Sequence, residues 1–164
     1  MSSTMPDVVV ALVLIIIANG APILMRFFLG VRLTFPVDGQ RHFFDGKRLF
    51  GNSKTWIGLL SIPVFSMAAA GLLGLSMEIG VLAGAGVMAG DLLSSFTKRR
   101  LGMKESSMAL GLDQIPESLF PLLLLSNKMN YGTLEIVIAV ISFIVFELLV
   151  SRFLYWLHVR KQPY

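Results

Sequence analysis

Eight charged side chains are crowded into one stretch of the chain, residues 90–119, where one apolar segment ends and another begins. They are Asp91, Lys98, Arg99, Arg100, Lys104, Glu105, Asp113 and Glu117. Charge in or beside hydrocarbon has to be compensated, so ionisable residues at a membrane boundary indicate function. Carboxylate oxygens suit Mg²⁺, and lysine and arginine suit phosphate oxygens. The stretch is therefore typical of a site for a metal-bound polyphosphate.

Helical spacing places some of these charged residues on a common helix face. Asp91 and Lys98 fall on one face of a helix together with two serines between them, Ser94 and Ser95. Asp113 and Glu117 are four residues apart and share a face if the proline between them lies in the first helical turn, where proline is allowed. We expect both acids beside the basic end of the preceding helix.

A second polar segment, residues 29–55, is too long for a simple connector, and long ordered loops are usually functional. Residues 36–39 predict a turn. The segment ends in Asn52, Ser53, Lys54 and Thr55, where Ser53 or Asn52 could cap the following helix. A helix N-terminus with a nearby lysine is also a ready anion site. A cap with an interfacial lysine fits these residues equally well.

The rest of the chain predicts a single all-α integral membrane domain over residues 1–164. Mean hydropathy is +0.75 and 55% of residues are hydrophobic. Spans are expected at about 8–28, 56–75, 77–97, 113–127 and 133–157. The fourth, about 15 residues or about 22 Å long, is short of a hydrocarbon core of about 30 Å, so its start is expected below the membrane surface. Two glycine pairs in the third, Gly80 with Gly84 and Gly86 with Gly90, predict close helix packing.

Lysine and arginine gather in the loops at about 29–55 and 98–112 and in the C-terminal tail, with Lys128 as an exception. The positive-inside rule then predicts an outside N-terminus and a cytoplasmic C-terminus in the plasma membrane. Both polar loops would border one cytoplasm-facing polar cavity, where soluble nucleotides are available. Glu147, inside the fifth span, would either pair with another helix or meet this cavity.

The composition excludes or disfavours several kinds of site and function. The chain has no cysteine, which excludes a disulfide framework, thiolate chemistry and a cysteine-based zinc site. The formal net charge of +4 is attributed to cytoplasmic loops, and no nucleic-acid-binding module is recognisable. Residues 1–7 lack a basic region, so no cleavable signal peptide is expected.

Three motifs, in order, resemble the phosphatidate cytidylyltransferase (CDP-diacylglycerol synthase) superfamily. F-G-N-S-K-T-W at 50–56 looks like its upstream segment, and residues 90–106 and 112–115 look like the two halves of its signature. A short chain with five spans resembles the archaeal branch, the CDP-archaeol synthases. Glu105 stands where that family usually has Asp, Gln114 replaces an Arg, and Pro116 occupies the place of the second signature Asp, with Glu117 one residue on.

This resemblance implies transfer of the cytidylyl group of CTP to the phosphate of a prenylated glycerol phosphate lipid, 2,3-bis-O-geranylgeranylglycerol 1-phosphate, giving CDP-archaeol and pyrophosphate with Mg²⁺ as cofactor. Asp91, Glu105, Asp113 and, less directly, Glu117 would hold one or two metal ions. Lys98, Arg99 and Lys104 would bind the β- and γ-phosphates. The phosphate cradle would be completed by Asn52, Ser53, Lys54 and Thr55, with Arg48 or Lys47 near the lipid phosphate.

Three other functions stay open. A CTP-dependent polyprenol kinase would release CDP instead of pyrophosphate. A small membrane transporter would use the embedded acids as its ion path, although we see no internal repeat of the kind many transporters have. A noncatalytic membrane subunit would bury the acids in ion pairs. The residues alone leave open the nucleotide base, the ether linkage, the saturation of the lipid chains, and whether the chain forms a homodimer.

Overall fold

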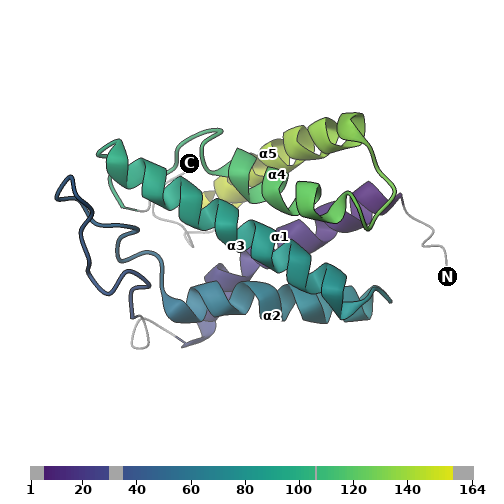
Figure 1. Cartoon of the computed structure of the whole chain (residues 1–164), viewed down its shortest axis with the longest axis horizontal. Coiled ribbons are helices and arrows are strands. Elements are labelled where there is room, and N and C mark those ends of the chain that lie inside the picture. Colours follow the sequence, from purple (N-terminus) through teal and green to yellow (C-terminus); the bar gives the residue numbers. More distant parts are fainter. Residues whose placement is uncertain (1–5, 30–34, 106, 157–164) are drawn as a thin grey trace.

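The computed structural model, which describes residues 6–29, 35–105 and 107–156, is all-helical, as predicted (Figure 1). Its five described helices are α1 (Asp7–Leu29), α2 (Trp56–Leu72), α3 (Met77–Arg100), α4 (Gln114–Leu125) and α5 (Thr133–Trp156). Each predicted span therefore coincides with one helix, within a few residues at its ends. Residues 30–34 of the predicted first loop, Ser106 in the second, the end of the last span at 157 and the basic tail lie outside the described residues.

Three of these helices are long and apolar enough to cross a membrane, namely α1, α3 and α5. The other two are shorter, with 17 residues in α2 and 12 in α4. Large apolar side chains remain exposed on the outside of the bundle, among them Leu72, Leu134 and Leu149. In water such surfaces would be unfavourable, whereas lipid chains accept them. The chain is therefore a membrane protein by length and composition.

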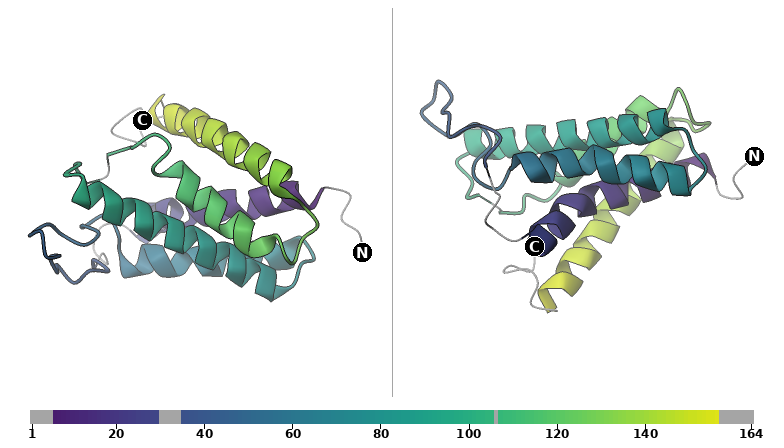
Figure 2. Two further views of the ribbon diagram at one scale, coloured as in Figure 1. Left: turned by 45° about the horizontal axis from the view of Figure 1, so that its top comes forward. Right: turned by 90° about the horizontal axis from the view of Figure 1, so that it is seen from below.

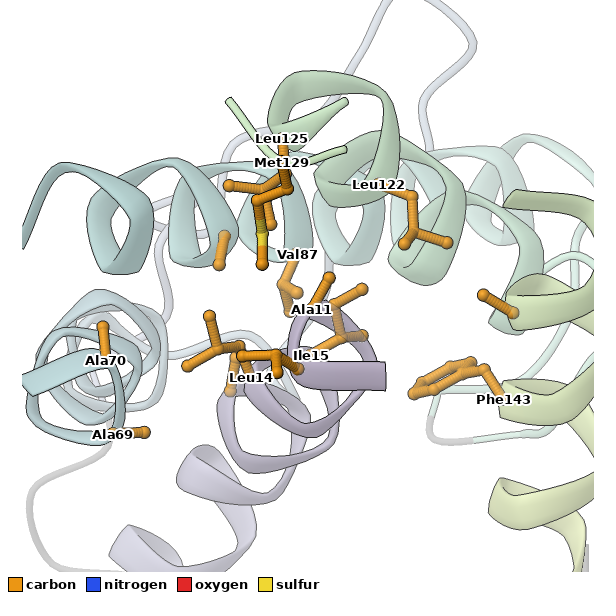
Figure 3. Packing of buried hydrophobic residues seen from close by; sticks show 14 of the residues in the cluster. Ala11, Leu14, Ile15, Ala69, Ala70, Val87, Leu122, Leu125, Met129 and Phe143 are labelled. Carbon is orange, nitrogen blue, oxygen red and sulfur yellow. The ribbon is translucent and has the colours of Figure 1, made fainter. Parts of the chain in front are cut away.

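Helix α1 supplies much of the packed centre of the bundle. Its side chains Ala11, Leu14 and Ile15 are fully buried and meet side chains from the other four helices (Figure 3). Those partners include Ala69, Ala70, Val87, Leu122, Leu125 and Phe143. Figure 2 shows that α5 lies on the outside of the bundle, beside α1 and α4.

The glycines of α3 allow it to pack closely on two neighbours, as the small-residue spacing predicted. Gly80 and Gly84 face α2, and Gly86 and Gly90 face α4. A Cβ atom at Gly90 would lie 2.3 Å from the carbonyl oxygen of Pro116, so the two backbones are in direct contact there. This contact fixes the register between the second half of α3 and the start of α4.

The predicted helix cap before α2 was wrong by two or three residues. Thr55, rather than Ser53 or Asn52, is the N-cap residue, and its side chain accepts a hydrogen bond from the Gly58 N–H at 3.3 Å. An antiparallel bridge to Pro36 holds Thr55 in an extended conformation, with φ −114° and ψ 151°. The helix therefore cannot begin before residue 56. The predicted turn at 36–39 is present, closed by a hydrogen bond from Gly39 N–H to the Pro36 carbonyl.

Candidate active site

The two polar loops meet at the end of the bundle where α3 finishes, and the second of them returns to the start of α4, which lies alongside α3 (Figure 1). The Lys47 Nζ donates to the carbonyl of Arg100 at 2.9 Å, which ties the first loop to the last residue of α3. Lys98, two residues before the end of α3, pairs with Asp113 immediately before α4. Charged groups far apart in the sequence are thus assembled into one polar region.

Asp91, Glu117 and Lys54 form the first group of this region. The Lys54 ammonium is hydrogen-bonded to the Asp91 carboxylate, and both side chains are about four-fifths buried. The Glu117 carboxyl lies against Asp91 and within electrostatic range of Lys54 and of Glu147 on α5. Asp91 and Glu117 each follow directly on a residue of the α3–α4 backbone contact, Gly90 and Pro116 respectively. That contact is what brings the two acids together.

Lys98 and Asp113 form a second group, nearer to the end of α3. Their Nζ and Oδ1 atoms are 2.8 Å apart, and the Lys98 Nζ also donates to the Ser107 carbonyl at 3.0 Å. The other Asp113 oxygen accepts from the Ala109 N–H at 3.0 Å. Both ionic side chains are largely buried, as are Ser94 and Ser95 on the same face of α3, as predicted. Pro116 falls in the first turn of α4, so Asp113 and Glu117 do share the inward side.

A shallow open pocket of about 310 Å³ lies between the first loop and the turn after α3. It is lined by Lys47, Arg48, Arg99, Gly102, Met103 and Glu105. Arg99 Nη2 donates to the carbonyls of Met103 and Lys104, at 2.8 and 2.9 Å, and so holds that turn against α3. The Arg99 Nε is buried and has no hydrogen-bond partner among the described residues. Lys104, which follows Met103 in the chain, is exposed.

The turn at residues 51–55 connects this pocket to Asp91. Glu105 Oε2 accepts from the Asn52 N–H at 3.2 Å, and Asn52 Oδ1 accepts from Arg48 Nη1 at 3.1 Å. Gly51 has φ +90°, and a Cβ there would lie 2.7 Å from Glu105 Oε1. Ser53 is half-buried in the same turn. The predicted cradle residues therefore stand side by side between Glu105 and Asp91.

One organising residue, Asp38, was not among the predicted site residues. Its carboxylate is buried and accepts from Arg48 and from the N–H groups of Gln40, Phe50 and Gly51. Burial alone would raise the pKa of Asp38, but these hydrogen bonds outweigh it and lower the pKa to about 2. The same pair raises the pKa of the Arg48 guanidinium. Sequence indicated a turn here, but the partners of Asp38 lie up to 13 residues away and follow no local periodicity.

The predicted set of four metal-binding carboxylates is divided between three groups. Asp91 and Glu117 face each other, whereas Asp113 is paired with Lys98 and Glu105 with the Asn52 N–H. Within residues 6–29, 35–105 and 107–156, no three acidic or histidine side chains stand close enough together to hold a metal ion. Two neighbouring carboxylates still fit Mg²⁺, which commonly takes one or two protein carboxylates and completes its octahedron with water and substrate phosphates. The residues at Asp91 and Glu117 therefore fit this ion.

Comparison with known proteins shows which family this chain resembles. A family model described as CarS-like, CDP-archaeol synthase, matches residues 59–164. A CDP-archaeol synthase of Thermococcus onnurineus is 34% identical over 150 residues, which cover 85% of this chain and 80% of that relative. One from Pyrobaculum islandicum is 31% identical over 153 residues, covering 90% and 92%. A solved structure described as an intramembrane enzyme for archaeal membrane lipids biosynthesis is similar to this chain with a TM-score of 0.74 at 27% identity, covering 87% of this chain and 91% of that one.

Proposed function

The chain belongs to the CDP-archaeol synthase family, and on that premise we propose that it transfers the cytidylyl group of CTP to an unsaturated archaetidic acid. The acceptor is 2,3-bis-O-geranylgeranylglycerol 1-phosphate, and the products are CDP-archaeol and pyrophosphate. Family membership makes the chain a cytidylyltransferase of archaeal membrane-lipid biosynthesis. The proposal adds the identity of the lipid and the residues that act on it.

The observation that carries the proposal is the mutual pairing of cations and carboxylates at one end of the bundle. Lys54 is paired with Asp91, and Lys98 with Asp113. A triphosphate with a bound divalent cation offers each member of these pairs a new partner, since its phosphate oxygens suit the lysines and its metal suits the carboxylates. A site that is neutralised internally in this way is well suited to exchange its own ion pairs for those of such a substrate.

The reaction needs positioning more than acid–base chemistry. An oxygen of the lipid phosphate forms a bond to the α-phosphorus of CTP, while the bond from that phosphorus to the oxygen bridging to the β-phosphate breaks. The bridging oxygen and its electron pair leave with pyrophosphate. A phosphate monoester is already anionic near neutral pH, so no strong general base is required. The protein has to align the two anions and neutralise their charge.

We assign the phosphate-binding roles by position. Lys54, with Asn52, Ser53 and Thr55 in the same turn, would hold the triphosphate beside Asp91 and Glu117. Lys98, Arg99 and Lys104 would bind its β- and γ-phosphates from the α3 side. Arg48 and Lys47, which line the open pocket, would meet the lipid phosphate. The prenyl chains would lie between helices that face the bilayer.

Asp91 and Glu117 would hold Mg²⁺, which when bound supplies positive charge to the phosphate oxygens as the leaving group departs. Asp113 and Glu105 remain predicted metal-binding residues, and each would first have to release its present partner, Lys98 or the Asn52 N–H. The positive-inside distribution supports a site that faces the cytoplasm of the plasma membrane, where CTP is available.

The direct test is pyrophosphate release by the purified protein in detergent with CTP and Mg²⁺, with and without unsaturated archaetidic acid. We expect release only when both substrates are present. Matched reactions would contain the saturated lipid, an ester-linked phosphatidic acid, or UTP in place of CTP. Release of CDP with a prenyl alcohol as acceptor would reject the proposal and indicate that the protein is a CTP-dependent polyprenol kinase. The absence of turnover with every lipid phosphate would reject it.

A further inference from the structure

The first loop is organised around one buried acid that the reaction itself does not use. Asp38 has a side chain with 0% exposure and accepts five hydrogen bonds. Oδ1 accepts from Gln40 N–H at 3.0 Å and from Arg48 Nη2 at 2.6 Å. Oδ2 accepts from Arg48 Nε at 3.1 Å, Phe50 N–H at 3.1 Å and Gly51 N–H at 2.9 Å. The carboxylate is therefore fully engaged by donors on both sides of the loop.

The Arg48 side chain extends this arrangement towards the cradle. Its guanidinium binds Asp38 through two nitrogens and Asn52 Oδ1 through the third. A bidentate arginine–carboxylate contact fixes orientation as well as distance. Since Asp38 also holds the Gly51 N–H, it fixes the backbone and a side chain on either side of the same turn.

That turn carries the groups assigned to the phosphates. Gly51 adopts φ +90°, and the next N–H group, that of Asn52, points to Glu105. Three residues after Gly51, the Lys54 ammonium reaches Asp91. The bridge between Pro36 and Thr55 closes the loop at its other end. A change at Asp38 would therefore be transmitted to Asn52 and Lys54 through a short stretch of hydrogen-bonded backbone.

We propose that Asp38 is a positioning residue for CTP, which sets the place of Asn52 and Lys54 without touching the nucleotide. This inference rests on the proposed function, since it concerns the same phosphate cradle. A misplaced cradle weakens binding of the triphosphate in the ground state and the transition state alike. The expected signature is a higher KM for CTP with little change in kcat.

The test compares Asp38→Asn with Asp45→Asn in the full-length protein. Asp45 is a matched control because it lies in the same loop and accepts from the Lys47 N–H, but it makes no described contact with residues 50–55. For Asp38→Asn we expect the KM for CTP to rise about 10-fold, with kcat changed less than about 3-fold. The KM for the lipid should also rise, because Arg48, which is assigned to the lipid phosphate, is held by Asp38. Asp38→Glu, which keeps the charge, should restore part of the affinity. Asp45→Asn should resemble the wild type.

Hydrogen exchange supplies a readout that does not depend on turnover. In Asp38→Asn one of the two acceptor oxygens is replaced by an NH2 donor and the charge is lost, so the five hydrogen bonds to Asp38 cannot all be kept. The peptide covering residues 49–54 should therefore exchange faster, while peptides from α3 do not change. If Asp38→Asn and Asp38→Glu keep the wild-type KM for CTP, the inference is rejected. Equal losses in kcat with both KM values unchanged and a lower thermal midpoint would also reject it, in favour of a purely structural role. An inactive wild-type protein would instead reject the proposed function.

Discussion

On the α3–α4 side of the site two helix backbones are in direct contact. On the loop side, by contrast, the Asp38 carboxylate accepts hydrogen bonds from three backbone N–H groups. Gly90 and Pro116 make the first contact, and it places Asp91 and Glu117 opposite each other. On the loop side, Asp38 binds Arg48 and the Gly51 N–H, and we propose that it thereby sets the positions of Asn52 and Lys54. The proposed metal-binding acids thus depend on a missing side chain, and the proposed phosphate-binding groups depend on a charged one.

This difference matters because the two kinds of support respond to different perturbations. Close backbone packing is sensitive to added volume and insensitive to pH or salt. A hub of charged hydrogen bonds tolerates changes in nearby volume but depends on the ionisation of one group. Substitutions chosen on each side should therefore separate loss of catalysis from loss of CTP affinity.

The largest effect is expected at the acids held by the helices. Asp91→Asn should lower kcat about 1000-fold, since a bound metal supplies several kcal/mol of charge stabilisation. The helical content by circular dichroism should be unchanged. Asp113→Asn in a parallel assay would show whether the acid paired with Lys98 has the same role. High residual turnover in Asp91→Asn would show that Asp91 is not required for catalysis and would contradict its proposed metal-binding role.

Gly90→Ala tests the packing that places these acids. Its new Cβ would lie 2.3 Å from the Pro116 carbonyl oxygen and 2.5 Å from the carbonyl carbon, so the backbones must separate. We expect a loss of about 1–3 kcal/mol in the free energy of unfolding. Turnover should fall about 100-fold, because displacement by about 1 Å is enough to misalign a site.

Gly20→Ala is the matched control, since Gly20 is also inside a helix and a Cβ there would have no neighbour within 4 Å. It should be neutral or stabilising by up to about 1 kcal/mol. Pyrophosphate release and the thermal midpoint in detergent measure both variants. Full activity in Gly90→Ala would show that the α3–α4 contact does not set the position of the acids.

A smaller effect is expected from Gly51→Ala on the loop side. Gly51 and Gly46 both have positive φ, +90° and +75°, so alanine should cost about 1 kcal/mol at either position. Only at Gly51 would the Cβ meet Glu105, and the shift of that side chain would weaken its bond to the Asn52 N–H. We expect the KM for CTP to rise about 5-fold in Gly51→Ala and to be unchanged in Gly46→Ala. Equal KM values would argue against a role for this contact.

The smallest effect should appear in the pH dependence of stability. The pKa of Asp38 is lowered to about 2 from its ordinary value of 3.8, so the contribution of this carboxylate is complete above about pH 4 and is lost as the pH falls towards 2. The thermal midpoint of Asp38→Asn should therefore lie below that of the wild type at pH 6, and the gap should narrow at pH 3. A gap independent of pH would mean that the charge of Asp38 is not what stabilises the loop.

The helices and their inward faces were predictable because periodicity and hydropathy are local properties of the sequence. The two glycine pairs of α3 predicted close packing, although their spacing could not say that one pair serves α2 and the other α4. Contacts made by the loop residues were harder to predict from the sequence. The cap at Thr55 depends on a bridge to Pro36, and the grouping of Asp113 with Lys98 rather than with Asp91 depends on how two helices end. Both are set by tertiary contacts between residues 15 or more positions apart.

The 12 residues of α4 amount to a length of about 18 Å, well below a hydrocarbon thickness of about 30 Å, whereas the neighbouring α3 has 24 residues. Leu123 and Leu124 on this short helix are exposed to the surroundings. Such hydrophobic mismatch is accommodated by local thinning of the bilayer at a modest cost per ångström. The lipid headgroups beside α4 would then lie deeper than those elsewhere around the protein. Membrane thickness thereby becomes a variable that sets how far a lipid phosphate has to travel to reach Asp113 and Glu117.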